Sequence, residues 1–178
     1  PLGGYIEAGE SVIDIGSGTG SMALELAGTA SWVTGIDLSA EMAHFAERRR
    51  LAMGIHNAEF IHGSATQLSR HVSRSYDYAF LSLMLHSVSS ERRDSIMDSA
   101  RAVAAKFIII DYIAPMESKR AELIITAIER FAGGDHWRGY RHWMDNGALD
   151  GFAEKQGLTC IRSDMMVSGF SKIAVYSY

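Results

Sequence analysis

The chain has little cysteine, little net charge and no long apolar run. Cys160 is the only cysteine, so no internal disulfide can form, and a reducing cytoplasm is the expected location. The formal net charge of -4 gives no general attraction to nucleic acid or to anionic lipid. Apolar runs such as Phe107 to Ile110 have the length of a strand, whereas ~20 residues are needed to span a bilayer. We therefore expect neither a nucleic-acid partner nor a membrane partner.

The sequence also lacks an initiator Met and a visible signal peptide. Eleven residues precede the first clear strand. We expect that an N-terminal segment was removed or lies outside this chain. Nothing in the sequence indicates the oligomeric state.

What the chain does have is the composition of a folded domain. Its 178 residues are 47% hydrophobic and 21% charged, which is ordinary for a globular protein. This length can enclose one sizeable core, so we expect a single domain over residues 1–178.

Strand and helix signals alternate along most of the chain. Glycine, proline or capping residues separate short β-rich runs from helical stretches. The expected strands are 12–15, 32–37, 59–61, 78–83, 107–112, 158–167 and 170–176. The expected helices are 21–27, one that follows Ser39, 90–104, 117–130, 137–144 and 149–156. The alternation predicts a doubly wound α/β fold whose seven-stranded sheet is mostly parallel. Only about two residues separate the last two strands, which predicts a terminal antiparallel hairpin.

A glycine-rich loop follows the first strand. Glycines at the carboxyl end of a strand let the backbone turn tightly and approach a ligand at the next helix. A dinucleotide fingerprint would place its third glycine at position 21, but this chain has Ser21 there and glycine at Gly20. Asp37 ends the second strand, where a carboxylate can accept hydrogen bonds from both hydroxyls of a ribose. Asp37 alone is equally consistent with NAD.

The run Asp14-Ile15-Gly16-Ser17-Gly18-Thr19-Gly20 resembles the first motif of class I S-adenosylmethionine-dependent methyltransferases. The run Gly35-Ile36-Asp37-Leu38-Ser39 resembles the acidic motif that follows it in this family. The resemblance covers nearly the whole chain, including the terminal hairpin. It implies a Rossmann-like methyltransferase fold with S-adenosyl-L-methionine as cofactor and S-adenosyl-L-homocysteine as product.

The resemblance also assigns cofactor contacts. It implies that the glycine loop holds the methionine part, that Asp37 binds the ribose and that Leu38 packs on the adenine. Ser64 stands where the family usually has an acid for the adenine amino group, and an uncharged hydroxyl is the weaker acceptor. The cofactor-binding residues that we expect are Asp14, Gly16, Ser17, Gly18, Gly20, Asp37, Leu38, Ser64, Ala65, Leu81 and Ser82.

The acceptor side is expected after the fourth and fifth strands. His86 follows the fourth strand, Tyr112 ends the fifth, and residues 115–148 resemble the insertions that cover the active site in this family. We assign His86 and His136 as candidate catalytic bases and Tyr112, His136 and Tyr140 as substrate contacts. A packing role competes with this assignment, because Trp137, Tyr140 and Met144 have the spacing of a buried helix face. In that interpretation the solvated side carries Arg138, Arg141, His142 and Asp145.

The expected reaction is methyl transfer to a small-molecule acceptor. The chain lacks the Asn-Pro-Pro-Tyr or Asp-Pro-Pro-Tyr run of enzymes that methylate amino groups of DNA bases or glutamine, and it has no basic tract for a nucleic-acid backbone. We assign no residue to a metal. Two alternatives remain at this point: a methyltransferase-like binding module without catalysis, and a NAD-dependent oxidoreductase.

Overall fold

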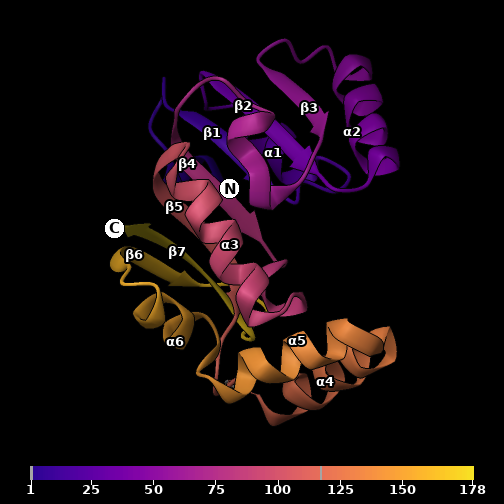
Figure 1. Cartoon of the computed structure of the whole chain (residues 1–178), viewed down its shortest axis with the longest axis vertical. Helices are drawn as coiled ribbons and strands as arrows, with labels where there is room; N and C mark the ends of the chain where they lie inside the picture. Colours follow the sequence, from indigo (N-terminus) through magenta and orange to yellow (C-terminus); the bar gives the residue numbers. More distant parts are fainter. Residues whose placement is uncertain (1, 117) are drawn as a thin grey trace. The chain divides into compact units, whose positions relative to one another are not determined.

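The computed structural model describes residues 2–116 and 118–178, and their strands and helices alternate as the sequence predicts (Figure 1). The strands are β1 (Ser11–Ile15), β2 (Trp32–Asp37), β3 (Ala58–His62), β4 (Tyr76–Ser82), β5 (Ala104–Tyr112), β6 (Thr159–Met165) and β7 (Ser171–Ser177). The α-helices are α1 (Ser21–Leu26), α2 (Ala40–Ala52), α3 (Ser90–Arg101), α4 (Lys119–Ala132), α5 (Gly134–Asp145) and α6 (Ala148–Lys155). Short 3-10 helices are η1 (Leu2–Tyr5), η2 (Ala65–Arg70) and η3 (Leu85–Ser87). The predicted start of the fourth long helix, Glu117, lies outside the described residues.

The strands hydrogen-bond in the order β3-β2-β1-β4-β5-β7-β6, which confirms the predicted doubly wound α/β sheet. The chain divides into two compact units. The N-terminal unit holds the residues up to Leu81 together with Ser95–Ile108. The C-terminal unit holds Ser82–Asp94 and Ile109–Tyr178. The chain therefore passes between the units three times.

The N-terminal unit is built on parallel strands. β1 pairs in parallel with both β2 and β4, and β2 pairs in parallel with β3. Four of the five residues of β1 are buried, as expected for a strand covered on both faces. Ser39 caps α2, as predicted, because its hydroxyl accepts a hydrogen bond from the Met42 amide.

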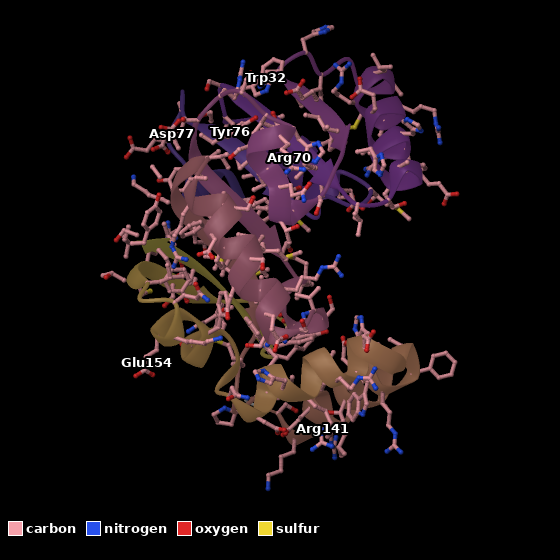
Figure 2. All side chains as sticks on the ribbon, in the orientation of Figure 1. Trp32, Arg70, Tyr76, Asp77, Arg141 and Glu154 are labelled. Carbon is pink, nitrogen blue, oxygen red and sulfur yellow. The ribbon has the colours of Figure 1, made fainter. Side chains whose placement is uncertain are left out.

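A polar network crosses the buried strands of this unit. Trp32 Nε1 and Tyr76 Oη, whose side chains are labelled in Figure 2, donate to the Thr34 hydroxyl oxygen at 3.0 and 2.8 Å. The same hydroxyl donates to Glu59 Oε1 at 2.9 Å. Since Thr34 and Tyr76 are buried, this network satisfies groups that water does not reach.

The C-terminal unit contains the predicted hairpin. β6 and β7 pair antiparallel, from Thr159 opposite Ser177 to Met165 opposite Lys172. All of β6 is exposed, whereas most of β7 is buried. A hairpin of this kind needs no helical connection, which is why the alternation stops here.

Two helices of this unit differ in how far their apolar side chains are buried. On α5 the buried side chains are Tyr140 and Trp143, so the predicted face of Trp137, Tyr140 and Met144 is confirmed at Tyr140, whereas Trp137 and Met144 are only partly buried. The four polar residues assigned to the solvated side are exposed, as expected. On α4 the apolar stripe is exposed, and its members are Leu123, Ile124, Ile128 and Phe131. Among the described residues, the helices are too short or too polar to cross a membrane.

Replacing Thr34 with valine should destabilise the fold, because valine keeps the shape but leaves the buried Tyr76 hydroxyl unpaired. We expect Thr34→Val to lower the free energy of unfolding by about 1–3 kcal/mol, measured by urea denaturation. The double variant Thr34→Val/Tyr76→Phe should recover part of this loss, with Tyr76→Phe as the matched control. A Thr34→Val variant as stable as the parent would show that the network contributes nothing.

Candidate functional site

The glycine loop and the acidic motif meet in the N-terminal unit. The amides of Gly16 and Ser17 donate to the Ile36 carbonyl at 2.8 and 3.1 Å. The Gly18 amide donates to Asp37 Oδ2 at 2.8 Å, and the Ser39 amide donates to Asp37 Oδ1 at 2.8 Å. Each carboxylate oxygen keeps a further lone pair. The Asp37 carboxylate is therefore held in place by backbone donors and can still accept hydrogen bonds.

Two positions in the loop require glycine for different reasons. Gly20 has φ +76°, and a Cβ there would lie 2.6 Å from the Phe60 ring and 2.8 Å from Ala46. Gly18 has φ +52°, and a Cβ there would meet nothing within 4 Å. Gly20 thus allows close packing beneath the loop, whereas Gly18 leaves open space above it, as a ligand approaching the backbone needs.

Asp14 lies beneath this loop and is fully buried. Its Oδ2 has no hydrogen-bond partner among the described residues, and neither does the buried hydroxyl of Ser17. Burial, together with the nearby charge of Asp37, raises the pKa of Asp14 from 3.8 to about 7, against the effect of a hydrogen bond from the Ala23 backbone. Through Ala23 the side chain is tied to the first turn of α1. Asp14 therefore connects β1 to the first turn of α1, and its expected contact with the cofactor stays a prediction.

The other expected cofactor residues lie at the ends of their elements. Leu38 is 62% exposed directly after β2, so its side chain is free to cover a flat ring. Ser64 caps η2, with its hydroxyl accepting from the Thr66 amide, and Ala65 begins that helix. The side chain of Leu81 is buried in the core of the N-terminal unit, and Ser82 opens the C-terminal unit.

The expected acceptor residues gather in the C-terminal unit. The ring centroid of His86 lies 4.5 Å from that of Tyr112, 5.7 Å from that of His136 and 6.4 Å from that of Tyr140. These four side chains come from η3, β5 and α5. The structure thus brings together all four residues that the sequence assigned to the acceptor side.

His86 is held by a buried carboxylate. Asp111 Oδ1 lies 2.7 Å from His86 Nδ1, and Asp111 Oδ2 accepts from the His86 and Leu85 amides at 3.3 and 3.1 Å. A carboxylate at Nδ1 holds the proton on that nitrogen and leaves the lone pair on Nε2. The His86 ring is therefore oriented with Nδ1 on Asp111 and with Nε2, the opposite ring nitrogen, available as a proton acceptor.

A second buried acid, Glu129 of α4, lies on the other side of the His86 ring. Its Oε1 is 3.8 Å from His86 Nε2 and accepts a hydrogen bond from Tyr112 Oη at 2.8 Å, while its Oε2 contacts His136 Nε2. Burial and the bond to Glu129 raise the pKa of Tyr112 far above its ordinary value, so the phenol stays protonated and donates. Oxygen atoms of the Glu129 carboxylate and imidazole nitrogens of His86 and His136 therefore lie close together.

The backbone around His86 is fixed by a buried guanidinium. Arg93 donates to the carbonyls of Leu85 at 2.7 Å, His86 at 3.3 Å and Gly139 at 2.7 Å. At Gly139 a Cβ would come within 2.8 Å of the Ser87 carbonyl carbon, so α5 approaches η3 through glycine. Arg93 thus locks the backbone of His86 to the helix that carries His136 and Tyr140.

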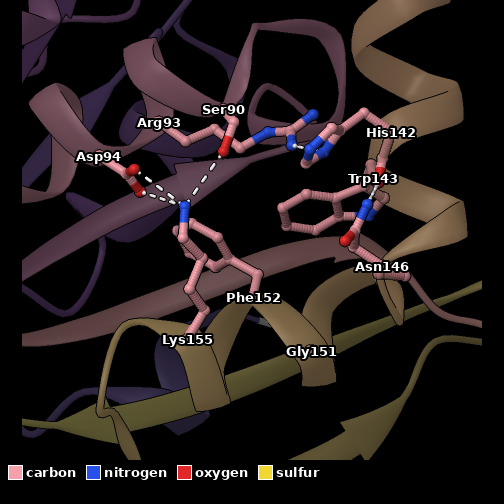
Figure 3. A pocket seen from close by; sticks show the side chains of 10 residues that line it. Ser90, Arg93, Asp94, His142, Trp143, Asn146, Gly151, Phe152 and Lys155 are labelled. Atoms are coloured by element: carbon pink, nitrogen blue, oxygen red, sulfur yellow. Dashed lines mark hydrogen bonds and ion pairs between the residues drawn. The ribbon is translucent and has the colours of Figure 1, made fainter.

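A small cavity of about 140 Å³ lies beside Arg93 (Figure 3). Arg93, Trp143 and Phe152 line it, and Lys155 bridges Ser90 and Asp94 across it. The charged groups on its wall are already paired, so we assign no chemistry to this cavity.

Three residues of the site have no counterpart in the sequence assignments. They are Asp111, Glu129 and Arg93. A carboxylate directly after three isoleucines, at the end of a strand, was a usable signal for Asp111. Glu129 and Arg93 lie on helices among other charged residues, so no local pattern distinguishes them.

Parts of this chain are similar in sequence to known methyltransferases. A family model described as a methyltransferase domain matches residues 12–106. The release factor glutamine methyltransferase of Vibrio cholerae serotype O1 is 46% identical over 55 residues, 30% of this chain and 19% of that protein. The demethylmenaquinone methyltransferase of Oceanobacillus iheyensis is 29% identical over 86 residues, 47% of this chain and 36% of that protein. The chain thus matches well under half the length of these relatives.

Solved structures resemble the whole chain. A SAM-dependent methyltransferase from Aquifex aeolicus superimposes with a TM-score of 0.67 at 18% identity, covering 96% of this chain and 82% of that one. The mitomycin 7-O-methyltransferase superimposes with a TM-score of 0.75 at 17% identity, covering 100% of this chain and 50% of that one. At these identities the similarity is one of fold.

The buried Asp14 should make stability fall with rising pH. Its pKa is higher in the folded chain than in the unfolded one, so the folded state holds the extra proton between about pH 4 and pH 7. The free energy of unfolding should decrease across that interval by an amount on the order of 4 kcal/mol. Asp14→Asn should remove this decrease, as measured by urea denaturation at a series of pH values. The exposed Asp98→Asn serves as control, and parallel pH profiles for Asp14→Asn and the parent would contradict the assignment.

Proposed function

Because the chain belongs to the family of methyltransferase domains, we propose that it transfers a methyl group from S-adenosylmethionine to a small-molecule acceptor. The observation that supports this most directly is the Asp37 carboxylate, held by the amides of Gly18 and Ser39 beside an open glycine loop. When bound, the cofactor supplies a methyl group on a positively charged sulfur, which is already activated for transfer.

The residues of the N-terminal unit fit this cofactor. Asp37 retains lone pairs for the two ribose hydroxyls, and the exposed side chain of Leu38 offers an apolar face to the adenine. The open space at Gly18 admits the methionine part close to the backbone. Ser64 already accepts from Thr66, so we propose that it contributes less to adenine binding than an acid would.

The C-terminal unit would bind the acceptor and take up its proton. His86 Nε2 carries the lone pair, and Asp111 stabilises the imidazolium that forms when the proton arrives. Tyr112, Tyr140 and the partly exposed His136 would line the acceptor position. The remaining contribution of the protein is alignment, because a preactivated methyl group needs mainly an in-line approach.

The chemistry of these groups favours a small acceptor with an ionisable proton. The candidate lining is aromatic and histidine-rich, and aromatic rings offer flat apolar surfaces for a ring-shaped ligand. One structural relative is named for 7-O-methylation of mitomycin, a small molecule. A basic surface for a nucleic-acid backbone is not part of this site, whose buried side chains include two carboxylates.

Cofactor binding should depend on Asp37. S-adenosylhomocysteine should raise the melting temperature of the chain, with about 2.7 kcal/mol of stabilisation at 100 times the dissociation constant, and NAD should not. Asp37→Ala should weaken binding by about 1–3 kcal/mol, because a charged acceptor for hydroxyl groups is lost. The exposed Asp98→Ala is the matched control. Stabilisation by NAD alone, or an Asp37→Ala variant of unchanged affinity, would contradict the proposal.

Methyl transfer should depend on His86 far more than cofactor binding does. With radiolabelled S-adenosylmethionine and a panel of phenols and hydroxy acids, His86→Ala should lower the rate by about 10²–10⁴-fold, as expected for loss of a general base. His136→Ala and Tyr140→Phe should also lower the rate while affinity for S-adenosylhomocysteine stays the same. His56→Ala, on an exposed loop, should have no effect. Transfer that persists per folded molecule in His136→Ala and Tyr140→Phe would assign both residues to packing.

A further inference from the structure

Two groups with free electron pairs face each other at the centre of the C-terminal unit. His86 Nδ1 lies 2.7 Å from Asp111 Oδ1, so in the neutral imidazole Nε2 carries the lone pair. Opposite it, at 3.8 Å, lies Glu129 Oε1, which is too far for a hydrogen bond and already accepts one from Tyr112. Two lone pairs facing one another in a buried place repel unless something positive lies between them.

The two buried acids of the cluster also favour a positive group at this position. Asp111 and Glu129 are both buried, at 0% and 5% exposure. The guanidinium of Arg93 forms its hydrogen bonds with backbone carbonyls and with His142, and with neither acid. The cluster therefore places two buried carboxylates around His86, and Glu129 Oε2 also contacts His136 Nε2. Buried charges in proteins are paired or bind metal ions, because an uncompensated charge is costly away from water.

We propose that His86, Glu129 and His136 bind a divalent transition-metal ion, for which Zn²⁺ is the reference. One ligand atom from each side chain lies within 4.8 Å of the others, and two ligands about 2.1 Å from a common ion lie roughly 3.4 Å apart at the tetrahedral angle. Two imidazoles and one carboxylate are donors that suit zinc and its neighbours. Three protein ligands leave a further position for water.

The surrounding residues support the ligands in the way metal sites require. Asp111 accepts the Nδ1 proton of His86, which orients the ring and makes Nε2 the better donor. Tyr112 donates a hydrogen bond to Glu129 Oε1 and so holds that carboxylate in place. His136, whose side chain is 38% exposed at the start of α5, gives the ion a route from solvent. The cation and the acceptor's proton compete for the same lone pair on His86, so the loaded chain cannot use His86 as a base.

Metal titration of the whole chain tests the site without any methyl-transfer assay. After treatment with a chelator, the chain should take up one Zn²⁺ in competition with a chromophoric chelator, and Co²⁺ should give visible d–d absorption. Glu129→Gln and His136→Ala should each weaken Zn²⁺ binding by at least about 100-fold, and Asp111→Asn by about 10–100-fold. Glu154→Gln and His56→Ala, which change an exposed acid and an exposed histidine, are the matched controls.

Folding of each variant is checked by circular dichroism, and His136→Gln provides a mild change at a partly exposed ligand. X-ray absorption of the Zn²⁺-loaded chain should show two imidazole ligands. Failure of the chain to bind Zn²⁺ or Co²⁺ would overturn the proposal. So would one bound ion whose affinity is the same in Glu129→Gln and His136→Gln, since the ion would then lie elsewhere. Either result leaves the binding of S-adenosylhomocysteine unaffected, so the proposed function is tested separately.

Discussion

The carboxylate of Asp111 organises the C-terminal unit. It accepts hydrogen bonds from the amides of Leu85, His86 and Tyr112 and from Nδ1 of His86, so one buried anion fixes both a backbone turn and a ring. Removing it would leave several buried donors unpaired, each costing about 1–3 kcal/mol. The turn starts at Leu83, whose φ of +49° is unusual for a side chain of this size. Asp111 and Arg93 together offset such strain, since they bind the amides and the carbonyls of the same short segment.

The two units hold their polar groups in different ways. In the N-terminal unit, backbone amides hold one acid, Asp37, in a half-buried position where it can accept further hydrogen bonds. In the C-terminal unit, side chains hold one another in a cluster of two acids, two histidines and two tyrosines, all of them buried except the partly exposed His136. The first arrangement suits a polar, hydroxyl-bearing ligand. The second suits an event at a single atom, the transfer of a proton or the binding of a cation at His86 Nε2.

The fold was predictable because its signals are local. Alternating strands and helices, the Ser39 cap and the short link between the last two strands each act within a few residues, and the family match confirms the resemblance carried by the glycine loop and Asp37. The acceptor residues His86, Tyr112, His136 and Tyr140 could be named, but what binds them could not. Asp111 lies 25 residues from His86, and Arg93 lies 46 residues from Gly139, so only the folded chain shows these pairs. Trp143 was missed because helix spacing identifies a face only to within one position.

The three passages of the chain between the units have a consequence for how such proteins can be recombined. Residues 82–94 belong to the C-terminal unit yet lie inside the matched family segment of residues 12–106. A hybrid made by joining two relatives after the fifth strand would take its histidine from one parent and Glu129 and α5 from the other. Such a hybrid would keep a glycine loop intact. It would separate His86 from Glu129 and Arg93 from Gly139, the residues that they contact in this chain. Keeping these contacts together in a hybrid therefore requires two inserted pieces, one on each side of residues 95–108.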